Sequence, residues 1–504
     1  MKRHVLRKIL SLLLCALLLN PLTGCQPERG YTVDPESPDA TFESPGAIVG
    51  SPEPTESQAP TPEVSEPASE VQTPTPRNPE PTSEVQTSTT GNAASSTANT
   101  ATNRKDPVTI YLVREHPLER LIEEYNQLEV GAKVNVVTFD SPTQLNNKLS
   151  AELMAGKGPD LVLYDSDYNG VSNLEKMMAQ NMFVNFDDLI VRDSSATAPN
   201  WEDYYETILD SGIYGGKRYF MPISYMPDIL ITTSELCEKY HIPTDSLLTY
   251  QTAEDIFSHY LAAGEAVGTI SMFYYINEEI LSLIDQNIDF FSRESRLDDQ
   301  FFRTNLDSLT AMILPADRSN YANPYDPLAA IAKERVLFAS LYQITGSQPT
   351  GLAYAYNELS TKGKTPIIFS NFSDGSSIGT AFFDKGFLIS SASANKEGAY
   401  EFVKYMLRQD TQENLEIGLP VNRNAQAKLL DEMDAEEYDQ GTVSDSFKES
   451  YMAYLESVTA CRFRNDYFNY NLVNDVVSQY IAGRLTQDQF LQGIQSRTNL
   501  YLGE

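Results

Sequence analysis

The stretch from 108 to 164 decides the fold. It opens on the continuous β-favouring run Val-Thr-Ile-Tyr-Leu-Val (108–113), which is followed by apolar residues at helical spacing. In chain order the predicted elements are a strand (108–113), a helix (118–128), a strand (134–139), a helix opened by Pro142 and ended by Gly156, and a strand (161–164). Strands that alternate with helices at this spacing predict a parallel α/β sheet.

Polar side chains follow the third predicted strand directly. Ligands of open α/β sheets bind beyond the carboxyl ends of the strands, so Asp165 and Ser166 are predicted to face a ligand. The segment 165–170 is also similar to the first half of a calcium loop. An EF-hand needs an acid at position 12, and that position holds Lys176, so we predict no metal site and a helix-capping turn instead.

The N-terminus has the pattern of an export signal. Basic residues at 2–8 precede a short apolar run (9–19), and Leu-Thr-Gly-Cys (22–25) follows. This tetrapeptide resembles a bacterial lipobox, which implies a signal peptide over 1–24 and a lipid on Cys25. The chain would then be held on the extracellular face of the cell membrane, as in Gram-positive bacteria. The alternative is an ordinary signal peptide with a chance cysteine.

Composition excludes several partners. The net charge is −33, and the basic signal makes the rest of the chain more acidic still, which argues against nucleic acid and anionic lipid. Beyond the signal only Cys237 and Cys461 remain, which gives no disulfide framework and no zinc site. We expect two unpaired thiols, with a single bridge as the alternative, and no cofactor.

The chain divides into a tether and a folded part. Residues 25–106 are rich in Pro, Ser, Thr and Glu and poor in apolar residues, so we expect disorder there and a folded domain over 107–504. About 400 residues suit two lobes better than one core.

Four blocks in the folded part resemble family 1 extracellular solute-binding proteins, the substrate-capturing subunits of ABC importers. They are 151–160 (AELMAGKGPD), 214–222 (YGGKRYFMP), the strand and helix from 388 to 407 with Asn-Lys-Glu-Gly-Ala at 395–399, and 419–422 (LPVN) with the end of the chain. The resemblance implies an α/β fold of the periplasmic-binding-protein-like type II, with two lobes and a hinge that the chain crosses three times. The implied crossings lie near 223–229, 370–374 and 409–419. The implied lobes are lobe 1, about 107–224 and 372–410, and lobe 2, about 228–370 and 418–504.

The resemblance also implies a function and a place for the ligand. A monomeric subunit would capture a small polar solute between its lobes, with a carbohydrate expected, and deliver it to permease subunits. Ligand contacts are expected from Tyr225 and Asp228 at the first crossing, and from Tyr342 and Ser347 after a second-lobe strand. Sugar-binding clefts often stack the ligand on tryptophan rings, whereas this chain has a single tryptophan, Trp201. Tyrosine is the residue that could stack a sugar in its place.

Other functions remain open at this level. Gly-Ser-Ser-Ile-Gly (375–379) matches a hydrolase nucleophile elbow, but no histidine follows it, so no catalytic residues are predicted. A glycoside hydrolase with paired carboxylates is one alternative. A surface sensor or adhesion protein that retains the binding fold is the other.

Overall fold

The computed structural model describes the folded part of the chain with several gaps. The described residues are 106–166, 171, 173–244, 248–262, 271–273, 276–313, 326–341, 349–373, 379–415, 418–432 and 443–503. The signal, Cys25 and the tether lie outside them, as do Tyr342, Ser347, most of the loop 165–170 and the segment 375–378.

The first sheet is built on the predicted N-terminal strands. Its order is β14-β6-β13-β3-β1-β2, with β15 paired to β13, and β1 runs parallel to both β2 and β3. Strand bounds are β1 (Val108–Val113), β2 (Val134–Phe139), β3 (Leu161–Asp165), β6 (Met221–Pro227), β13 (Gly379–Ile389), β14 (Leu419–Pro420) and β15 (Val458–Arg462). The prediction of a parallel arrangement in this stretch is therefore confirmed, and β13 and β6 add antiparallel pairs that make the sheet mixed.

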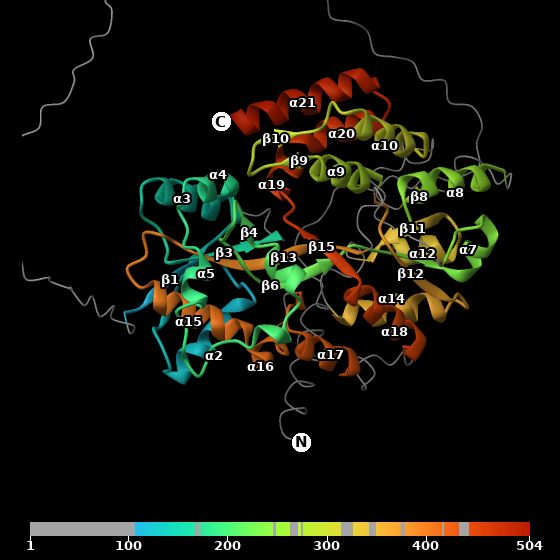
Figure 1. Cartoon of the computed structure of the whole chain (residues 1–504). Coiled ribbons are helices and arrows are strands. Elements are labelled where there is room, and N and C mark those ends of the chain that lie inside the picture. Colours follow the sequence, from blue (N-terminus) through green and yellow to red (C-terminus); the bar gives the residue numbers. More distant parts are fainter. Residues whose placement is uncertain are drawn as a thin grey trace, which may run out of the picture. The chain divides into compact units, whose positions relative to one another are not determined.

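Helices cover both faces of the first sheet (Figure 1). One face packs on α2 (Leu118–Leu128) and α15 (Lys396–Leu407), and the other on α3 (Pro142–Met154) and α4 (Leu174–Ala179). Local capping explains two of these helix starts. Ser141 Oγ accepts from Gln144 N at 3.3 Å, and Asn395 Oδ1 accepts from Gly398 N at 2.9 Å.

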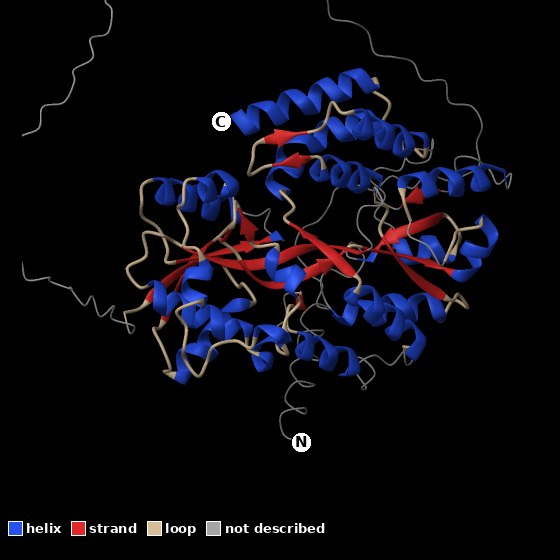
Figure 2. Cartoon of the chain, viewed as in Figure 1, coloured by secondary structure: helices blue, strands red, loops and turns tan. Residues whose placement is uncertain are grey.

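The second sheet has the order β12-β7-β11-β8. Its strands are β7 (Ile229–Thr233), β8 (Ser271–Phe273), β11 (Val336–Ser340) and β12 (Pro366–Ser370). Helices α12 (Pro327–Ala332), α14 (Pro349–Ser360) and α18 (Asp445–Glu456) contact its strands. Figure 2 shows the strands of both sheets with helices on either side of them, the arrangement of a mixed α/β fold.

The remaining elements are short strands, linking turns and further helices. They are α5 (Phe186–Ile190), η2 (Trp201–Asp203), α6 (Glu206–Asp210), β4 (Ile213–Tyr214), β5 (Lys217–Arg218), α7 (Ser234–Tyr240), α8 (Tyr250–Ala262), α9 (Ile276–Gln286), β9 (Ile288–Asp289), β10 (Glu294–Ser295), α10 (Gln300–Ala311), α16 (Gln409–Gln412), α17 (Arg423–Glu432), α19 (Asp466–Phe468), η3 (Asn469–Val473), α20 (Asn474–Ile481) and α21 (Gln487–Gly503). Helix α9 packs against α10 and α20, which places the C-terminal helices beside it.

The chain passes between the sheets at two of the predicted places. Strand β6 ends at Pro227 and β7 begins at Ile229, so Asp228 alone links the sheets there. Strand β12 ends at Ser370, and β13 of the first sheet begins at Gly379. The third passage, near 409–419, stays a prediction, and β14 at its end pairs with β6 of the first sheet.

The expected lobe boundaries stay a prediction. Within the segment 418–504, β14 and β15 hydrogen-bond to strands of the first sheet, whereas α18 contacts β12 of the second sheet. The C-terminal segment thus adds two strands to the first sheet and packs one helix on the second.

The described residues include no helix that is both long enough and apolar enough to cross a membrane.

Candidate functional site

A pocket lies where the chain passes between the two sheets, and we call it the hinge pocket. Its walls come from the two passages, from α9, and from the segment after β15. The lining residues used below are Asp228, Glu278, Glu279, Asn371, Asn469 and Tyr470. The pocket joins both sheets, since Phe382 of β13 and Ser340 of β11 also line it.

Backbone hydrogen bonds hold the two passages together. Asp228 N donates to Thr380 O at 2.9 Å, and Asn371 N donates to Asp228 O at 3.0 Å. The Tyr454 hydroxyl lies 2.9 Å from Asp228 O and 2.7 Å from Thr380 O. These contacts fix the position of Asp228 relative to the return strand, so its carboxyl group has a defined direction in the pocket.

Two carboxyl groups share one amide in the pocket. Asn371 Nδ2 donates to Asp228 Oδ1 and to Glu279 Oε2, each at 3.1 Å. Burial, together with the nearby charge of Asp228, raises the pKa of Glu279 from the usual 4.5 to about 8. Burial also raises the pKa of Asp228, partly offset by its hydrogen bond from Asn371. At neutral pH, Glu279 therefore keeps its proton.

An aromatic side chain provides a partly exposed wall. Tyr470 is 36% exposed, and its hydroxyl donates to Glu278 Oε2 at 2.9 Å. The guanidinium carbon of Arg464 lies 5.8 Å from the Tyr470 ring centroid, and Arg464 Nε lies 2.6 Å from Asp466 Oδ1. Carboxylates, amides and an aromatic face are the groups that orient polyhydroxylated ligands in protein pockets.

The walls lie close together in this structure. The hinge pocket has a cavity volume of about 40 Å³. At about 10–15 Å³ for each water, that is room for about three water molecules. A ring-sized ligand would therefore need the walls to separate, whereas a single polar group fits as the pocket stands.

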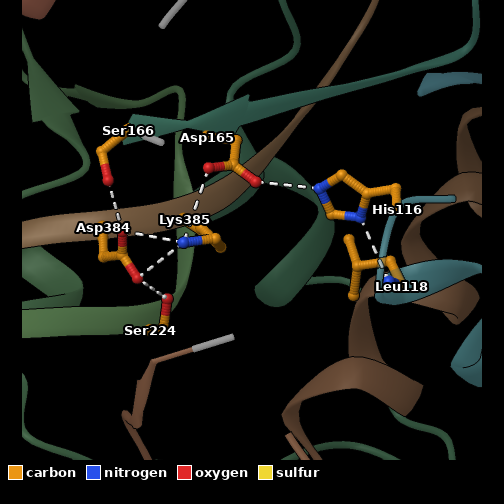
Figure 3. A network of polar contacts seen from close by, with 7 residues as sticks. All are labelled: His116, Leu118, Asp165, Ser166, Ser224, Asp384 and Lys385. Carbon is orange, nitrogen blue, oxygen red and sulfur yellow. Dashed lines mark hydrogen bonds and ion pairs between the residues drawn. The ribbon is translucent and has the colours of Figure 1, made fainter. Parts of the chain in front are cut away.

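Asp165 and Ser166 lie in a different place, the buried network of Figure 3. Asp165 Oδ2 is 2.8 Å from His116 Nε2, and its Oδ1 is 3.5 Å from Lys385 Nζ. His116 Nδ1 accepts from Leu118 N at 3.1 Å, so Nε2 carries the proton that His116 donates to Asp165. Asp165 is at the carboxyl end of β3 as predicted, but only 5% of its surface is exposed.

The centre of this network is an adjacent Lys–Asp pair. Lys385 Nζ lies 3.0 Å from both carboxylate oxygens of Asp384, and Ser166 Oγ and Ser224 Oγ donate to the same carboxylate. Gly418 lies against it with φ +132, and a Cβ there would be 2.5 Å from Asp384 Oδ2. The side chains of this network are buried, although His116 and Asp165 also line a small pocket beside β1 and α3, and their contacts join β3, β6 and β13.

The predicted ligand residues therefore separate into three groups. Asp228 lines the hinge pocket. Tyr225 is 1% exposed, donates from its hydroxyl to Gln426 Oε1 at 2.9 Å, and lies with its ring 5.9 Å from that of Tyr205. The structure thus makes Tyr225 a core residue of β6, with no face open to a ligand. Tyr342 and Ser347 lie outside the described residues.

Sequence reasoning missed Glu279, Asn371 and Asn469. They come from three separate segments, and no local motif marks any of them. Tyr470 stands in an aromatic cluster (467–470) whose spacing is equally typical of a core. The only signal for Asn371 was its place in the predicted second passage.

Metal and thiol chemistry have few candidates. Among the described residues, no group of three His, Cys, Asp or Glu side chains is placed to hold a metal ion. Cys237 and Cys461 are separate free thiols, as expected, and burial raises the pKa of each to about 12.

Comparison with known proteins confirms the family resemblance. Residues 114–270 match the family model of the bacterial extracellular solute-binding proteins. A comparison with curated proteins found no match.

Solved structures share the fold. An ABC substrate-binding protein from Listeria monocytogenes in complex with cycloalternan is similar with a TM-score of 0.53 at 14% identity, over 79% of this chain and 99% of that chain. The sugar-binding protein MalE from Xanthomonas citri gives 0.55 at 13% identity, over 79% and 97%. A cyclic α-maltosyl-1,6-maltose binding protein from Arthrobacter globiformis gives 0.52 at 12% identity, over 79% and 99%.

Proposed function

We propose that this chain, whose residues 114–270 match the bacterial extracellular solute-binding proteins and whose fold is similar to theirs, captures a small carbohydrate in the hinge pocket and passes it to the permease of an ABC importer. The observation that carries this proposal is the position of the pocket, at the passages between two sheets. It is lined by carboxyl groups, amides and the half-open face of Tyr470.

Binding would work by closure of the walls. Asp228 and Asn371 belong to the passages, whereas Glu279 is on α9 and Phe382 is on the first sheet. A ligand that contacts all of them has more partners when the walls are close, so it has higher affinity for the closed form. The small volume of the pocket fits a closed form that opens for loading.

Membrane attachment and delivery follow from the N-terminal signal. A lipid on Cys25, with the segment 26–106 as a flexible spacer, would hold a monomeric binding domain near the permease. Closure without chemistry is enough for this role, and the family and the similar solved structures are binding proteins.

The test is a thermal-shift screen of mono- and oligosaccharides followed by calorimetry. A ligand present at about 100 times its Kd should add about 2.7 kcal/mol to the free energy of unfolding. Tyr470→Ala should weaken binding at least tenfold, whereas Tyr354→Ala, which alters an exposed tyrosine on α14, should not. If no saccharide binds, or if glycosides are turned over, the proposal is wrong.

A further inference from the structure

One buried side chain outside the lining of the hinge pocket joins elements of the two sheets. Glu175 is on α4, whose apolar residues pack with Tyr164 of β3 on a face of the first sheet. Glu175 is 2% exposed, and its Oε1 accepts from Asn465 Nδ2 at 2.5 Å. The Tyr501 hydroxyl donates to its Oε2 at 3.3 Å. Glu175 therefore ties α4 to two residues of the C-terminal segment.

The C-terminal helix that Glu175 contacts is packed together with the second sheet. Tyr501 is on α21, which packs on α20, and α20 packs on α9. From α9 the packing continues through α10, α8 and α7 to β7 of the second sheet. The contact between Glu175 and Tyr501 therefore joins a helix of the first sheet to the helices that accompany the second.

Asn465 connects this contact to the hinge pocket. It belongs to the segment 464–470, which supplies three residues of the pocket wall. Asp285 Oδ1 on α9 accepts from Asn465 N and from Asn469 Nδ2, each at 3.3 Å. The segment is thus held by α9 on one side and by Glu175 of α4 on the other. A movement of α4 away from α21 would release one of these two attachments of the pocket wall.

The surroundings of Glu175 favour its protonated form. Burial raises the pKa of Glu175 from the usual 4.5 to about 7, and hydrogen bonds from the backbone and from Tyr501 offset part of this effect. The like charge of Asp285 also raises this pKa, whereas Lys176 lowers it. The Lys176 ammonium group itself lies 4.5 Å from the centre of the Tyr501 ring. Near pH 6, Glu175 therefore keeps its proton between the two helices.

Glu175 also lines a cavity of about 530 Å³ between the first sheet and α9. The other charged groups around this cavity, besides Asp285, are Asp210 on α6, Asp289 on β9, Arg462 on β15 and Arg296 after β10. Within the described part of the chain, none of these four forms an ion pair with Glu175. Separation of α4 from α21 would expose the Glu175 carboxyl group to water on this side.

We propose that Glu175 is a positioning residue for solute capture, whose carboxyl group ties α4 to Asn465 and Tyr501 and so holds the walls of the hinge pocket in the closed arrangement. This inference rests on the proposed function, in which the walls close on the solute, and adds the group that controls closure. A protonated carboxyl group is accommodated between the helices, whereas an ionised one is costly to bury. Loss of the proton from Glu175 therefore favours the open form.

Closure can be measured on the full chain without a solute. Nitroxide labels on Glu123→Cys and Arg335→Cys report the distance between the sheets by double electron–electron resonance. Both positions are exposed, on α2 beside the first sheet and directly before β11 of the second. Burial raises the pKa of the Cys237 and Cys461 thiols to about 12, which slows their labelling, and the chain without the added cysteines gives the background.

The ratio of closed to open molecules should depend on pH through Glu175. The closed form binds the proton more tightly, so closure is favoured at low pH and weakens as pH rises from about 4.5 to about 7. From pH 6 to pH 8 these two pKa values give a fall of about tenfold in the ratio for the parent protein. Glu175→Gln copies the protonated group and should remove this tenfold part of the fall.

A second variant and a control complete the experiment. Glu175→Ala lacks the contacts with Asn465 and Tyr501 and should shift the ratio about fivefold towards the open form at pH 6, the size of one lost hydrogen bond. Glu449→Gln alters an exposed acid on α18 and should follow the parent at both pH values. Circular dichroism melts at pH 6 and pH 8 establish that each variant is folded.

The outcomes separate this inference from the function it rests on. An equal pH dependence in the parent and Glu175→Gln overturns the inference, as does a Glu175→Ala variant that is as closed as the parent, or a single distance in every variant. These results leave carbohydrate binding to be decided by the thermal-shift screen. Opening that depends on Glu175 in a protein that binds no saccharide supports the inference and overturns the carbohydrate proposal.

Discussion

Glu279→Gln should make the stability of this protein less sensitive to pH. In the native structure, burial and the neighbouring Asp228 raise the pKa of Glu279 from 4.5 to about 8. In the unfolded chain the same carboxyl group releases its proton at its usual pKa. The native state therefore binds more protons than the unfolded state between about pH 4.5 and pH 8, and the free energy of unfolding falls as pH rises through this window.

The size of this effect follows from how steeply the free energy of unfolding changes with pH. One proton difference changes the free energy of unfolding by about 1.4 kcal/mol for each pH unit, so the contribution of Glu279 falls by about 3 kcal/mol between pH 5.5 and pH 7.5. That is a large part of a total stability of about 5–15 kcal/mol. Gln keeps the side-chain shape and the acceptor for Asn371 Nδ2, and it does not titrate.

Urea unfolding at pH 5.5, 6.5 and 7.5 measures this difference. Glu175 and Asp285 also have pKa values raised by burial, each to about 7, so the parent protein and the variant should both lose stability as pH rises. The gap between the two profiles isolates Glu279, and it should widen in favour of the variant by about 3 kcal/mol across the range. Glu449→Gln, an exposed change on α18, should run parallel to the parent.

Parallel profiles for Glu279→Gln and the parent would refute the reasoning. Such a result would mean that Glu279 ionises in the native protein at an ordinary pKa, and that the pocket is wetter than its burial indicates.

Further outcomes are expected elsewhere in the chain. Lys385→Met removes the ammonium group that lies beside the buried carboxylates of Asp384 and Asp165 and should cost about 3–5 kcal/mol in urea unfolding; a cost below 1 kcal/mol would contradict the network. Tyr225→Phe should lower the free energy of unfolding by about 1 kcal/mol and leave the ligand affinity measured by calorimetry unchanged; a large loss of affinity would show that Tyr225 contacts the ligand. Cys25→Ala should move the protein from the membrane fraction to the medium or leave it unprocessed, and a processed, membrane-bound mutant would argue against lipid anchoring. Residues 107–504 alone should melt cooperatively, since the tether lacks apolar residues for a core; a non-cooperative melt would show otherwise.

The sequence by itself determined those helices and strands whose bounds depend only on neighbouring residues. The strand 108–113, the helix 118–128 and the strand 134–139 occur with the predicted bounds, because each buries a face that its own periodicity defines. The starts of α3 and α15 were equally local, since Ser141 and Asn395 cap their helices within three residues. The passage at Asp228 followed from a family resemblance carried by short contiguous blocks.

Only the tertiary structure decided which side chains meet. Tyr225 and Asp228 are three residues apart, yet one lies in the core of β6 and the other lines the hinge pocket, because the strand ends between them. Glu279 and Asn371 lie beside Asp228 although at least 51 residues of chain separate them from it. Lys385 lies beside Asp165 because β13 pairs with β3. Such contacts depend on sheet register and helix packing, which are set by burial over the whole domain. No local sequence pattern around the contacting residues therefore predicts them.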